Sequence, residues 1–169
     1  MKTRARSRGG YQKLVLERGV SAGDEWLRVA PESIREVLKG LQAEGYEVLL
    51  FLTCVDHLAT PAAPAPERFE LVYQLRDMDR RRLVRVRTFL DGEDPEIASV
   101  HDIFPPADWD ERETWDLFGV RFVGHPGLTR ILMPDDWVGH PLRRDYPVGG
   151  EPVDFSEEHE RWQTAPPQG

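Results

Sequence analysis

Two neighbouring stretches alternate between apolar and polar side chains, and this alternation limits the fold more than any other feature. Residues 68–75 read RFELVYQL and residues 81–90 read RRLVRVRTFL, on either side of a polar turn. Such alternation places every second side chain on one face of a strand. The pattern predicts an antiparallel hairpin with one face on the core. The interleaved Arg85 and Arg87 then face either solvent or a partner chain.

The segments before this hairpin predict a helix and a buried strand. Residues 31–45, PESIREVLKGLQAEG, begin with a proline that suits a first helical turn, carry one apolar face and end at a glycine. The run YEVLLFLTCV, residues 46–55, is nearly continuous in apolar character and short, which indicates a central buried strand. Residues 11–18 fit a short helix, residues 25–29 a strand, and TPAAPAPE, residues 60–67, a loop.

The second half of the chain has a different character. The segment SVHDIFPPADWDERETWDLFG predicts two short helices separated by a pair of prolines. In the second helix, Asp108 and Glu111 fit a capping box, and Gly119 fits the stop. Arg112 and Asp116 stand four residues apart, a spacing at which they can pair. We therefore interpret the acids of this helix as a solvated face paired with arginine, followed by an irregular, extended chain rich in Gly and Pro.

Together these elements predict an α+β fold with two layers, in which a mainly antiparallel sheet carries helices on one face and an extended C-terminal arm follows. Residues 1–10 are expected to form a basic, disordered N-terminus, and residues 11–123 the α+β core domain. Residues 124–148 are expected to form a partner-binding arm, and residues 149–169 an acidic, proline-containing flexible tail. An extended arm of this kind needs a second surface to lie on.

Composition excludes several classes of protein. The chain of 169 residues has a net charge of −8 at pH 7, whereas a general nucleic-acid binder needs a surplus of clustered Lys and Arg. Its single cysteine, Cys54, excludes an intramolecular disulfide and Cys-rich zinc or iron–sulfur sites. We interpret Cys54 as a small buried hydrophobe in a reducing, cytoplasmic setting. No apolar run approaches the ~20 residues of a membrane-spanning helix, so we expect no direct membrane span.

Two Gly-His-Pro triplets are the most tempting candidates for chemistry. They contain His125 and His140, with Asp135 and Asp136 between them. A zinc or iron site gains from closely spaced ligands on one rigid element, whereas these histidines lie on separate loops. Glycine before each histidine permits a tight turn, and proline after it favours an extended backbone, without any metal. We interpret both as structural or interface residues; a metal-dependent hydrolase that uses them is the distant alternative.

Other candidate groups carry weaker signals. Asp56 and His57 follow the predicted strand 46–55, and a strand-end pair of this type is a loose signal for catalysis. The carboxylates of DWDERETWD lack the differing environments that general acid–base catalysis requires. The chain has no phosphate loop, no G-x-G-x-x-G, no G-x-S-x-G and no Cys-His signature. The residues alone therefore favour a domain that binds another protein.

The segment ERETWDLFGVRFVGHPGLTRILMP, residues 111–134, resembles the 30-kDa subunit family of respiratory complex I, known in bacteria as the C subunit of NADH-quinone oxidoreductase. The signature is long and ordered: Glu-Arg-Glu, an acid at Asp116, two apolar residues, a glycine and then Gly-His-Pro. GHPLRRDYPV, FLTCVDHL and ERFELVYQL are similar to other segments of the family, which extends the match over most of residues 46–148. The family usually has a basic residue where Thr129 stands, so that role falls here to Arg130.

The resemblance implies a hydrophilic structural subunit in the peripheral arm of a proton-pumping NADH-quinone oxidoreductase. FMN, iron–sulfur clusters and quinone then belong to partner subunits, and this chain packs against the 49-kDa-type D subunit in a hetero-oligomer on the cytoplasmic side of the cell membrane. No catalytic, cofactor-binding or metal-binding residue is implied on this chain. The implied motif and interface residues are Glu111, Arg112, Glu113, Asp116, Gly119, His125, Pro126, Arg130, His140, Pro141, Arg143, Arg144, Asp145 and Tyr146.

Within this set the resemblance implies different roles. The acids and arginine of the Glu-Arg-Glu motif, with Asp116, organise the helix and its junction, and residues 143–146 engage the 49-kDa-type subunit. A related machine is the alternative: similar subunits occur in membrane-bound hydrogenases, formate hydrogenlyase-type complexes and photosynthetic NDH complexes, sometimes fused to the next subunit. The sequence ends without such a fusion, which favours a separate complex I subunit.

Overall fold

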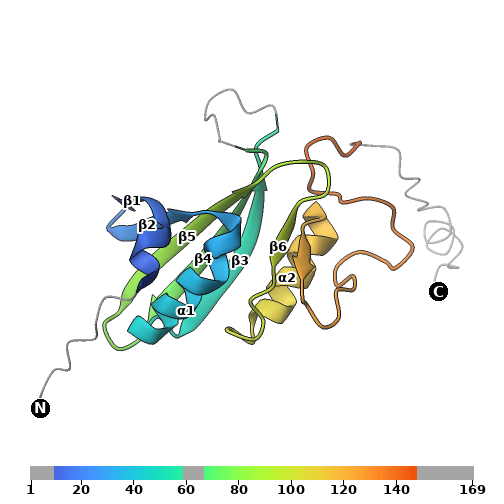
Figure 1. The fold of residues 1–169 in the computed structure, drawn as a ribbon. Coiled ribbons are helices and arrows are strands. Elements are labelled where there is room, and N and C mark those ends of the chain that lie inside the picture. The colour runs from blue at the N-terminus through green and yellow to red at the C-terminus, as the bar shows by residue number, and fades with distance from the viewer. Residues whose placement is uncertain (1–9, 59–66, 148–169) are drawn as a thin grey trace, which may run out of the picture.

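The structure, a computed structural model, describes residues 10–58 and 67–147. The predicted tail at 149–169, nearly all of the N-terminus and most of the loop at 60–67 lie outside these residues. Figure 1 shows the fold. With η for a 3-10 helix, its elements are η1 (Gly10–Leu14), β1 (Val15–Ser21), β2 (Asp24–Val29), η2 (Pro31–Ser33), α1 (Ile34–Glu44), β3 (Val48–Asp56), β4 (Phe69–Asp77), β5 (Arg82–Leu90), β6 (Glu96–Ala98), α2 (Ala107–Phe118) and β7 (Arg121–Val123).

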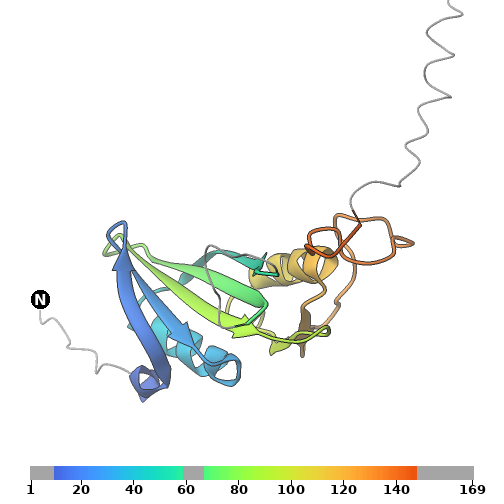
Figure 2. The ribbon, with the colours of Figure 1, turned by 90° about the horizontal axis from the view of Figure 1, so that it is seen from above.

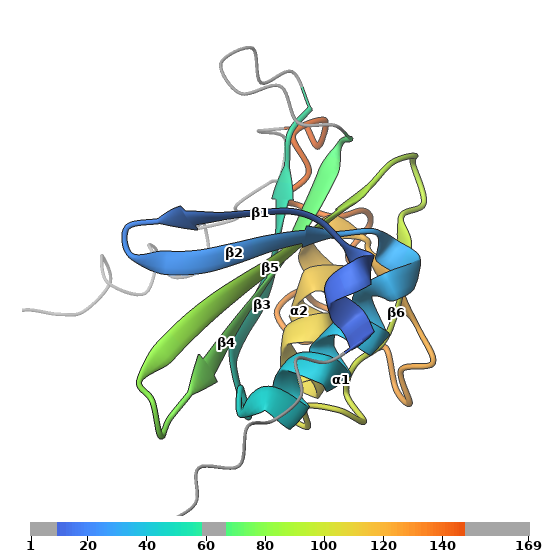
Figure 3. The same cartoon turned by 60° about the vertical axis from the view of Figure 1, so that its left-hand side comes forward.

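Five strands form one mixed sheet in the order β1-β2-β5-β4-β3, and β6 and β7 form a separate parallel pair. Within the larger sheet only β2 and β5 pair in parallel. The predicted hairpin is confirmed as β4 and β5, in register from Phe69↔Leu90 to Asp77↔Arg82. α1 crosses one face of the sheet, and α2 lies beside β3 (Figures 2 and 3). The predicted α+β fold with a mainly antiparallel sheet is confirmed.

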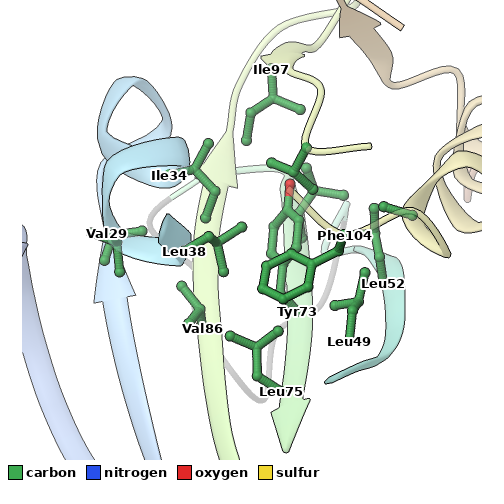
Figure 4. Close-up of a cluster of buried hydrophobic side chains, with 14 of the residues drawn as sticks. Val29, Ile34, Leu38, Leu49, Leu52, Tyr73, Leu75, Val86, Ile97 and Phe104 are labelled. Carbon is green, nitrogen blue, oxygen red and sulfur yellow. The ribbon is translucent and has the colours of Figure 1, made fainter. Parts of the chain in front are cut away.

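One hydrophobic core joins the sheet to the helices (Figure 4). Alternate side chains of β4 and β5 point into it and meet the apolar face of α1. Burying a Val, Leu, Ile or Phe side chain stabilises a fold by ~1.5–3 kcal/mol, so this cluster dominates the driving force for folding. Its fully buried members are Ile34, Val37, Leu38, Phe69, Leu71, Tyr73, Leu75, Val84, Val86, Val100, Ala107 and Val120.

Helix α1 follows its sequence prediction, and one of its glycines has a packing role. Gly45 ends the helix in the left-handed conformation, with φ 111°. Gly40 lies inside the helix, where glycine is a poor helix former. The ring of Tyr11, in η1, packs directly against it: a Cβ on Gly40 would stand 2.1 Å from Tyr11 Cδ1. Close approach of η1 to α1 therefore requires glycine here.

The N-terminal prediction was partly wrong. Residues 11–18 do not form one helix, because the 3-10 turn ends at Leu14 and β1 begins at Val15. β1 pairs antiparallel with β2, and the ring of Trp26 covers Gly19 so closely that a Cβ there would lie 2.6 Å from it. The strand conformation of β1 therefore arises from pairing with β2, a tertiary contact that local periodicity does not show.

The prediction of a central strand at residues 46–55 was also wrong, because β3 is an edge strand of the sheet. Leu52 and Cys54 point into the core, whereas Phe51 and Val55 on the other face are exposed. The sequence of β3 is almost continuously apolar because the face that points away from the core also carries apolar side chains, among them Phe51 and Val55. Helix α2 covers the free edge: Asp110 accepts a hydrogen bond of 2.9 Å from the backbone N–H of Leu52.

Residues 99–119 contain one helix rather than two. Residues 101–103 form only a turn, and α2 starts after Pro106, with no side chain capping its first turn. Asp108 therefore lies inside the helix instead of at its N-cap, so the predicted capping box was wrong. Glu111 points into the protein interior and has no exposed surface.

The packing of Gly40 gives a test of the fold. By helix propensity alone, Gly40→Ala would stabilise α1 by about 1 kcal/mol. We expect the opposite sign, a loss of about 1–3 kcal/mol in the free energy of unfolding, because the added methyl group collides with Tyr11. Urea unfolding of the full chain measures it, and Lys39→Ala at the exposed neighbouring position is the control. A stabilised Gly40→Ala variant would contradict the packing described here.

Candidate partner-binding site

Asp116, in the last turn of α2, is a fully buried carboxylate that holds the arm in place. Its Oδ2 accepts hydrogen bonds from three consecutive backbone N–H groups, those of Ile131 (3.0 Å), Leu132 (2.8 Å) and Met133 (2.9 Å). Its Oδ1 forms an ion pair with Arg130. Burial by itself raises the pKa of Asp116, but these donors outweigh burial and lower the pKa to about 2. Asp116 is therefore ionised at neutral pH.

Arg130 closes the arm on itself. Besides its ion pair with Asp116, it donates hydrogen bonds to the carbonyl oxygens of Trp137 (2.8 Å) and Gly139 (3.1 Å). Its guanidinium lies over the ring of Trp115, 5.7 Å from the centroid. The planar fork of arginine can serve several acceptors at once. Arg130 stands at the start of the loop 130–139 and binds carbonyl groups at its end. Its ion pair with Asp116 also ties this loop to α2.

The arm also satisfies the end of α2. The last carbonyl groups of a helix have no partner within the helix. Here His140 donates its Nδ1–H to the carbonyl of Asp116 (2.9 Å), the backbone N–H of Leu142 binds the carbonyl of residue 117 (3.0 Å), and Arg143 Nε binds that of residue 118 (2.6 Å). The arm therefore acts as the C-terminal cap of the helix.

Gly119 makes this cap possible. It adopts φ 75°, as predicted for the helix stop, and a Cβ there would lie 2.5 Å from both the ring of His140 and the guanidinium of Arg143. Burial lowers the pKa of His140, so its ring is neutral at pH 7 and Nδ1 carries the donated proton. In this structure His140 works as a hydrogen-bond donor to the helix.

A second anchor fixes the end of the arm to the sheet. The buried Asp56, at the end of β3, binds Arg68 (2.9 Å) and accepts the backbone N–H groups of Arg144 (2.9 Å) and Leu58 (2.9 Å). Arg68 also pairs with Asp145 (2.7 Å). Burial raises the pKa of Asp56, but Arg68 and the two backbone donors reverse the shift and lower it. Asp56, which the sequence offered as a weak candidate for catalysis, binds the backbone of the arm instead.

His125 is enclosed by its own chain. Its side chain has no exposed surface; Nε2 lies 2.9 Å from Asp108 Oδ1, and Nδ1 accepts the backbone N–H of Gly127 (3.1 Å). Both ring nitrogens therefore have protein partners, as a structural histidine requires. Asp135 and Asp136 are exposed on the arm. Within residues 10–58 and 67–147, no three His, Cys, Asp or Glu side chains are grouped so that they would hold a metal ion.

Two expectations about α2 were wrong. Arg112 does not pair with Asp116; it donates to the carbonyl groups of Thr129 (3.2 Å) and Arg130 (3.1 Å). The acidic face is not uniformly solvated, because Glu111 and Asp116 are both fully buried. The helix turns these acids towards the segment before it and the arm after it, contacts that helical spacing does not reveal.

The remaining predicted residues lie at the surface of the arm or of α2. Glu113, Pro126 and Arg144 are exposed, and Pro141 is half-buried. Tyr146 donates its hydroxyl to the carbonyl group of residue 138 (3.3 Å). Sequence reasoning missed Arg68, whose only local signal was its place at the start of the predicted hairpin.

Several apolar side chains of the arm are exposed, while many of its hydrogen-bonding groups are used to bind α2 and the sheet. Val138 is 85% exposed, Leu132 59% and Leu142 52%. Leu58 is also exposed, and its carbonyl oxygen lies 3.5 Å from the guanidinium of Arg144. We call Leu58, Leu132, Val138, Leu142 and Arg144 the arm surface. In the described part of the chain, no helix has both the length and the apolar character needed to cross a membrane.

Solved structures share this fold. A trypsin-resistant fragment of Nqo5 matches with a TM-score of 0.62 and 32% sequence identity, covering 66% of this chain and 89% of the fragment. A chain of the membrane-bound sulfane sulfur reductase, an archaeal respiratory membrane complex, matches with a TM-score of 0.67 over 90% of this chain and 85% of its own. At 24% identity the second match shows the fold alone. The fold is thus that of an Nqo5-like α+β domain.

The chain belongs to the respiratory-chain NADH dehydrogenase 30 Kd subunit family, whose model matches residues 27–152. It is 46% identical to the NADH-quinone oxidoreductase C subunit of Salinispora tropica over 147 residues, which are 85% of this chain and 57% of the relative. It is 40% identical to subunit 5 of the Thermus thermophilus enzyme, over 80% of this chain and 67% of that protein. The chain therefore spans little more than half the length of its Salinispora relative. The resemblance seen in the sequence is confirmed.

The Asp116 anchor gives the second test. Asp116→Ala leaves Arg130 and three backbone N–H groups without their acceptor. We therefore expect a loss of about 3–5 kcal/mol in the free energy of unfolding. Amide hydrogen exchange at residues 131–133 should accelerate more than exchange in β4. The control is Asp136→Ala, which removes an exposed carboxylate from the same arm. Equal effects of the two variants would contradict the anchoring role.

Proposed function

We propose that this chain is the 30-kDa-type subunit of a proton-pumping NADH-quinone oxidoreductase: a hydrophilic subunit without a cofactor of its own, which packs through its arm on the 49-kDa-type subunit. The observation that carries the proposal is the arrangement of the arm, whose polar groups bind this chain while Val138, Leu132 and Leu142 are presented to the outside. An ordered apolar surface of this kind is characteristic of a site that binds protein.

The use of the motif residues supports a structural role. The family signature around Asp116 and Arg130 is engaged in fixing the arm, and His125 and His140 serve the same end. Catalysis requires groups that are free to act on a substrate, whereas these groups are committed to hydrogen bonds within the chain. FMN, iron–sulfur clusters and quinone would accordingly reside on partner subunits, and electrons would pass from NADH to quinone without crossing this chain.

The arm surface offers the two kinds of group that protein interfaces use, exposed apolar side chains and an exposed arginine. Apolar side chains supply the area that is removed from water, and the exposed guanidinium of Arg144 can bind carboxylate or carbonyl groups of the partner. Attachment through this surface to the 49-kDa-type subunit would hold the chain on the cytoplasmic side of the cell membrane without a span of its own.

The test of identity is affinity purification of the tagged chain from its own cells in mild detergent, with mass spectrometry of the recovered proteins and elemental analysis of the isolated chain. Recovery of the quinone-site, iron–sulfur and NADH-binding subunits, with no metal on the chain alone, is the expected result. Hydrogenase-type or formate hydrogenlyase-type subunits in their place would assign the chain to a related machine. A lone chain with stoichiometric zinc or iron would refute the structural role.

Substitutions on the arm surface test where the partner binds. Val138→Asp and Arg144→Ala should each lower the amount of assembled complex roughly tenfold or more, because loss of an interface contact of about 2 kcal/mol changes an equilibrium by more than a factor of ten. Both side chains point away from the core, so the free energy of unfolding of the isolated chain should change by less than about 0.5 kcal/mol.

Met78→Asp is the matched control, because Met78 is 58% exposed in the turn at the other end of β4 from Arg68. It should leave the recovery of partner subunits unchanged. If Met78→Asp and Val138→Asp reduce assembly equally, the arm surface is not the docking site.

A further inference from the structure

Glu111 is a buried acid that neither the arm nor the proposed docking surface uses. It has no exposed surface, and among the described residues it has no ion-pair partner. One carboxylate oxygen accepts the backbone N–H of Val100 (2.7 Å), and the other makes a short hydrogen bond with the hydroxyl group of Ser99. Ser99 and Val100 directly follow β6, so Glu111 links α2 to the smaller sheet. An unpaired carboxylate in such a place is costly in its ionised form.

The hydroxyl group of Ser99 connects Glu111 to a histidine. Ser99 is itself buried, and its Oγ lies 2.9 Å from His101 Nδ1. A hydroxyl group donates one hydrogen bond and can accept two, and a neutral imidazole nitrogen can be donor or acceptor. Two hydrogen bonds therefore form a continuous chain that runs from Glu111 Oε2 through Ser99 Oγ to His101 Nδ1. His101 is half-buried, so part of this residue is open to solvent.

This hydrogen-bonded chain has two complete arrangements with the same heavy-atom positions. In the first, the protonated carboxyl group of Glu111 donates to Ser99, whose hydroxyl donates to a neutral His101. In the second, the Glu111 proton has passed to Ser99 and the Ser99 proton to Nδ1, which leaves a carboxylate and an imidazolium. One O–H bond of the acid is broken and one N–H bond is formed, while the hydroxyl group is regenerated. Both carboxylate oxygens of Glu111, the hydroxyl group of Ser99 and Nδ1 of His101 keep a hydrogen-bond partner in both arrangements.

The acid at one end of the hydrogen-bonded chain holds its proton more tightly than an exposed glutamate does. Burial raises the pKa of Glu111 to about 7, although the bonds from Ser99 and Val100 lower it in part. The serine hydroxyl joins this acid to the imidazole through two hydrogen bonds. When two titratable groups interact strongly, a proton belongs to the pair rather than to one residue.

Other charged and titratable groups face the cluster from each neighbouring element. On α2, Asp108 favours the protonated acid; from α1, the positive charge of Arg35 favours the carboxylate but is shared with Asp102 at 2.7 Å. From β4, the buried phenol of Tyr73 senses the charge of Glu111, since burial first and that charge second raise its pKa. The ring of His125 also lies near the cluster, 5.7 Å from that of His101.

We propose that Glu111, Ser99 and His101 form a proton-binding site that holds one proton at neutral pH, shared between the carboxyl group and the imidazole through the serine hydroxyl. The ligand is a proton from solvent, which enters at the half-buried His101. Loss of the shared proton leaves an unpaired buried carboxylate at the junction of α2 with the segment after β6, and so loosens that junction. The inference is independent of the proposed function.

The test is a pH titration of the full chain by NMR, from pH 4.5 to 9, which follows the glutamate side-chain carboxyl carbons and the histidine ring. We expect the Glu111 and His101 signals to move together in two shared steps. Glu111→Gln and His101→Asn should each reduce the response to a single step at the remaining group, and Ser99→Ala should uncouple the two groups so that each titrates in one step of its own. Glu113→Gln, on the exposed face of the same helix, should leave both steps in place.

Thermal unfolding gives a second readout. The pKa of Glu111 in the folded state exceeds its ordinary value, so its contribution to stability is complete below about pH 4.5 and is lost as pH rises through about 7. The melting temperature of the wild-type chain should therefore fall between pH 5 and 8 relative to that of Glu111→Gln. The change of the unfolding free energy with pH should correspond to the release of one proton. A Glu111 carboxyl that titrates below pH 5, with a His101 titration unchanged by Glu111→Gln or Ser99→Ala, would overturn the proposal.

Discussion

The ionised carboxylate of Asp116 is the interaction on which the second half of the structure depends. Removing a charge from water is expensive, and the cost is offset only where donors surround it. Three backbone N–H groups and Arg130 do so here, and all four come from the arm. The dependence is mutual: the arm supplies the donors that Asp116 needs when it is buried, and Asp116 accepts hydrogen bonds from three consecutive backbone N–H groups of the arm. The described part of the arm is therefore held to the sheet and to α2 by specific polar contacts.

Much of the sheet could be predicted, because its signals are local. Alternation in β4 and β5 reflects one buried face, and Gly45 and Gly119 mark helix ends through a backbone conformation that glycine adopts without strain. The errors fall where a distant segment decides the structure. β1 is a strand because β2 lies beside it, and β3 is at the edge although its outward face carries Phe51 and Val55. From the sequence alone, a strand whose exposed face is apolar cannot be told apart from a strand that is buried on both faces.

The contacts of the motif residues were predicted less well than the fold. The Glu-Arg-Glu and Gly-His-Pro signatures stand out in the sequence, but they do not show which groups their side chains bind. Asp116 was expected to pair with Arg112 across one helical turn and binds Arg130 instead. Asp56 was weighed for catalysis, although it binds the backbone of residue 144. Spacing along a helix limits which neighbours can meet, whereas the choice of a partner on an irregular arm depends on a path that the sequence does not encode in any short pattern.

The bond between Asp56 and the backbone of Arg144 joins residues 88 positions apart. Closing so large a loop carries an entropic cost that only a preformed surface can recover. Asp56 is in place once β3 has paired with β4, and Arg68, which shares the carboxylate, stands just before the strand that completes that pairing. The arm can therefore take this position only on a sheet in which β3 and β4 are already paired. Its ordered conformation reports on the pairing of strands far away in the sequence.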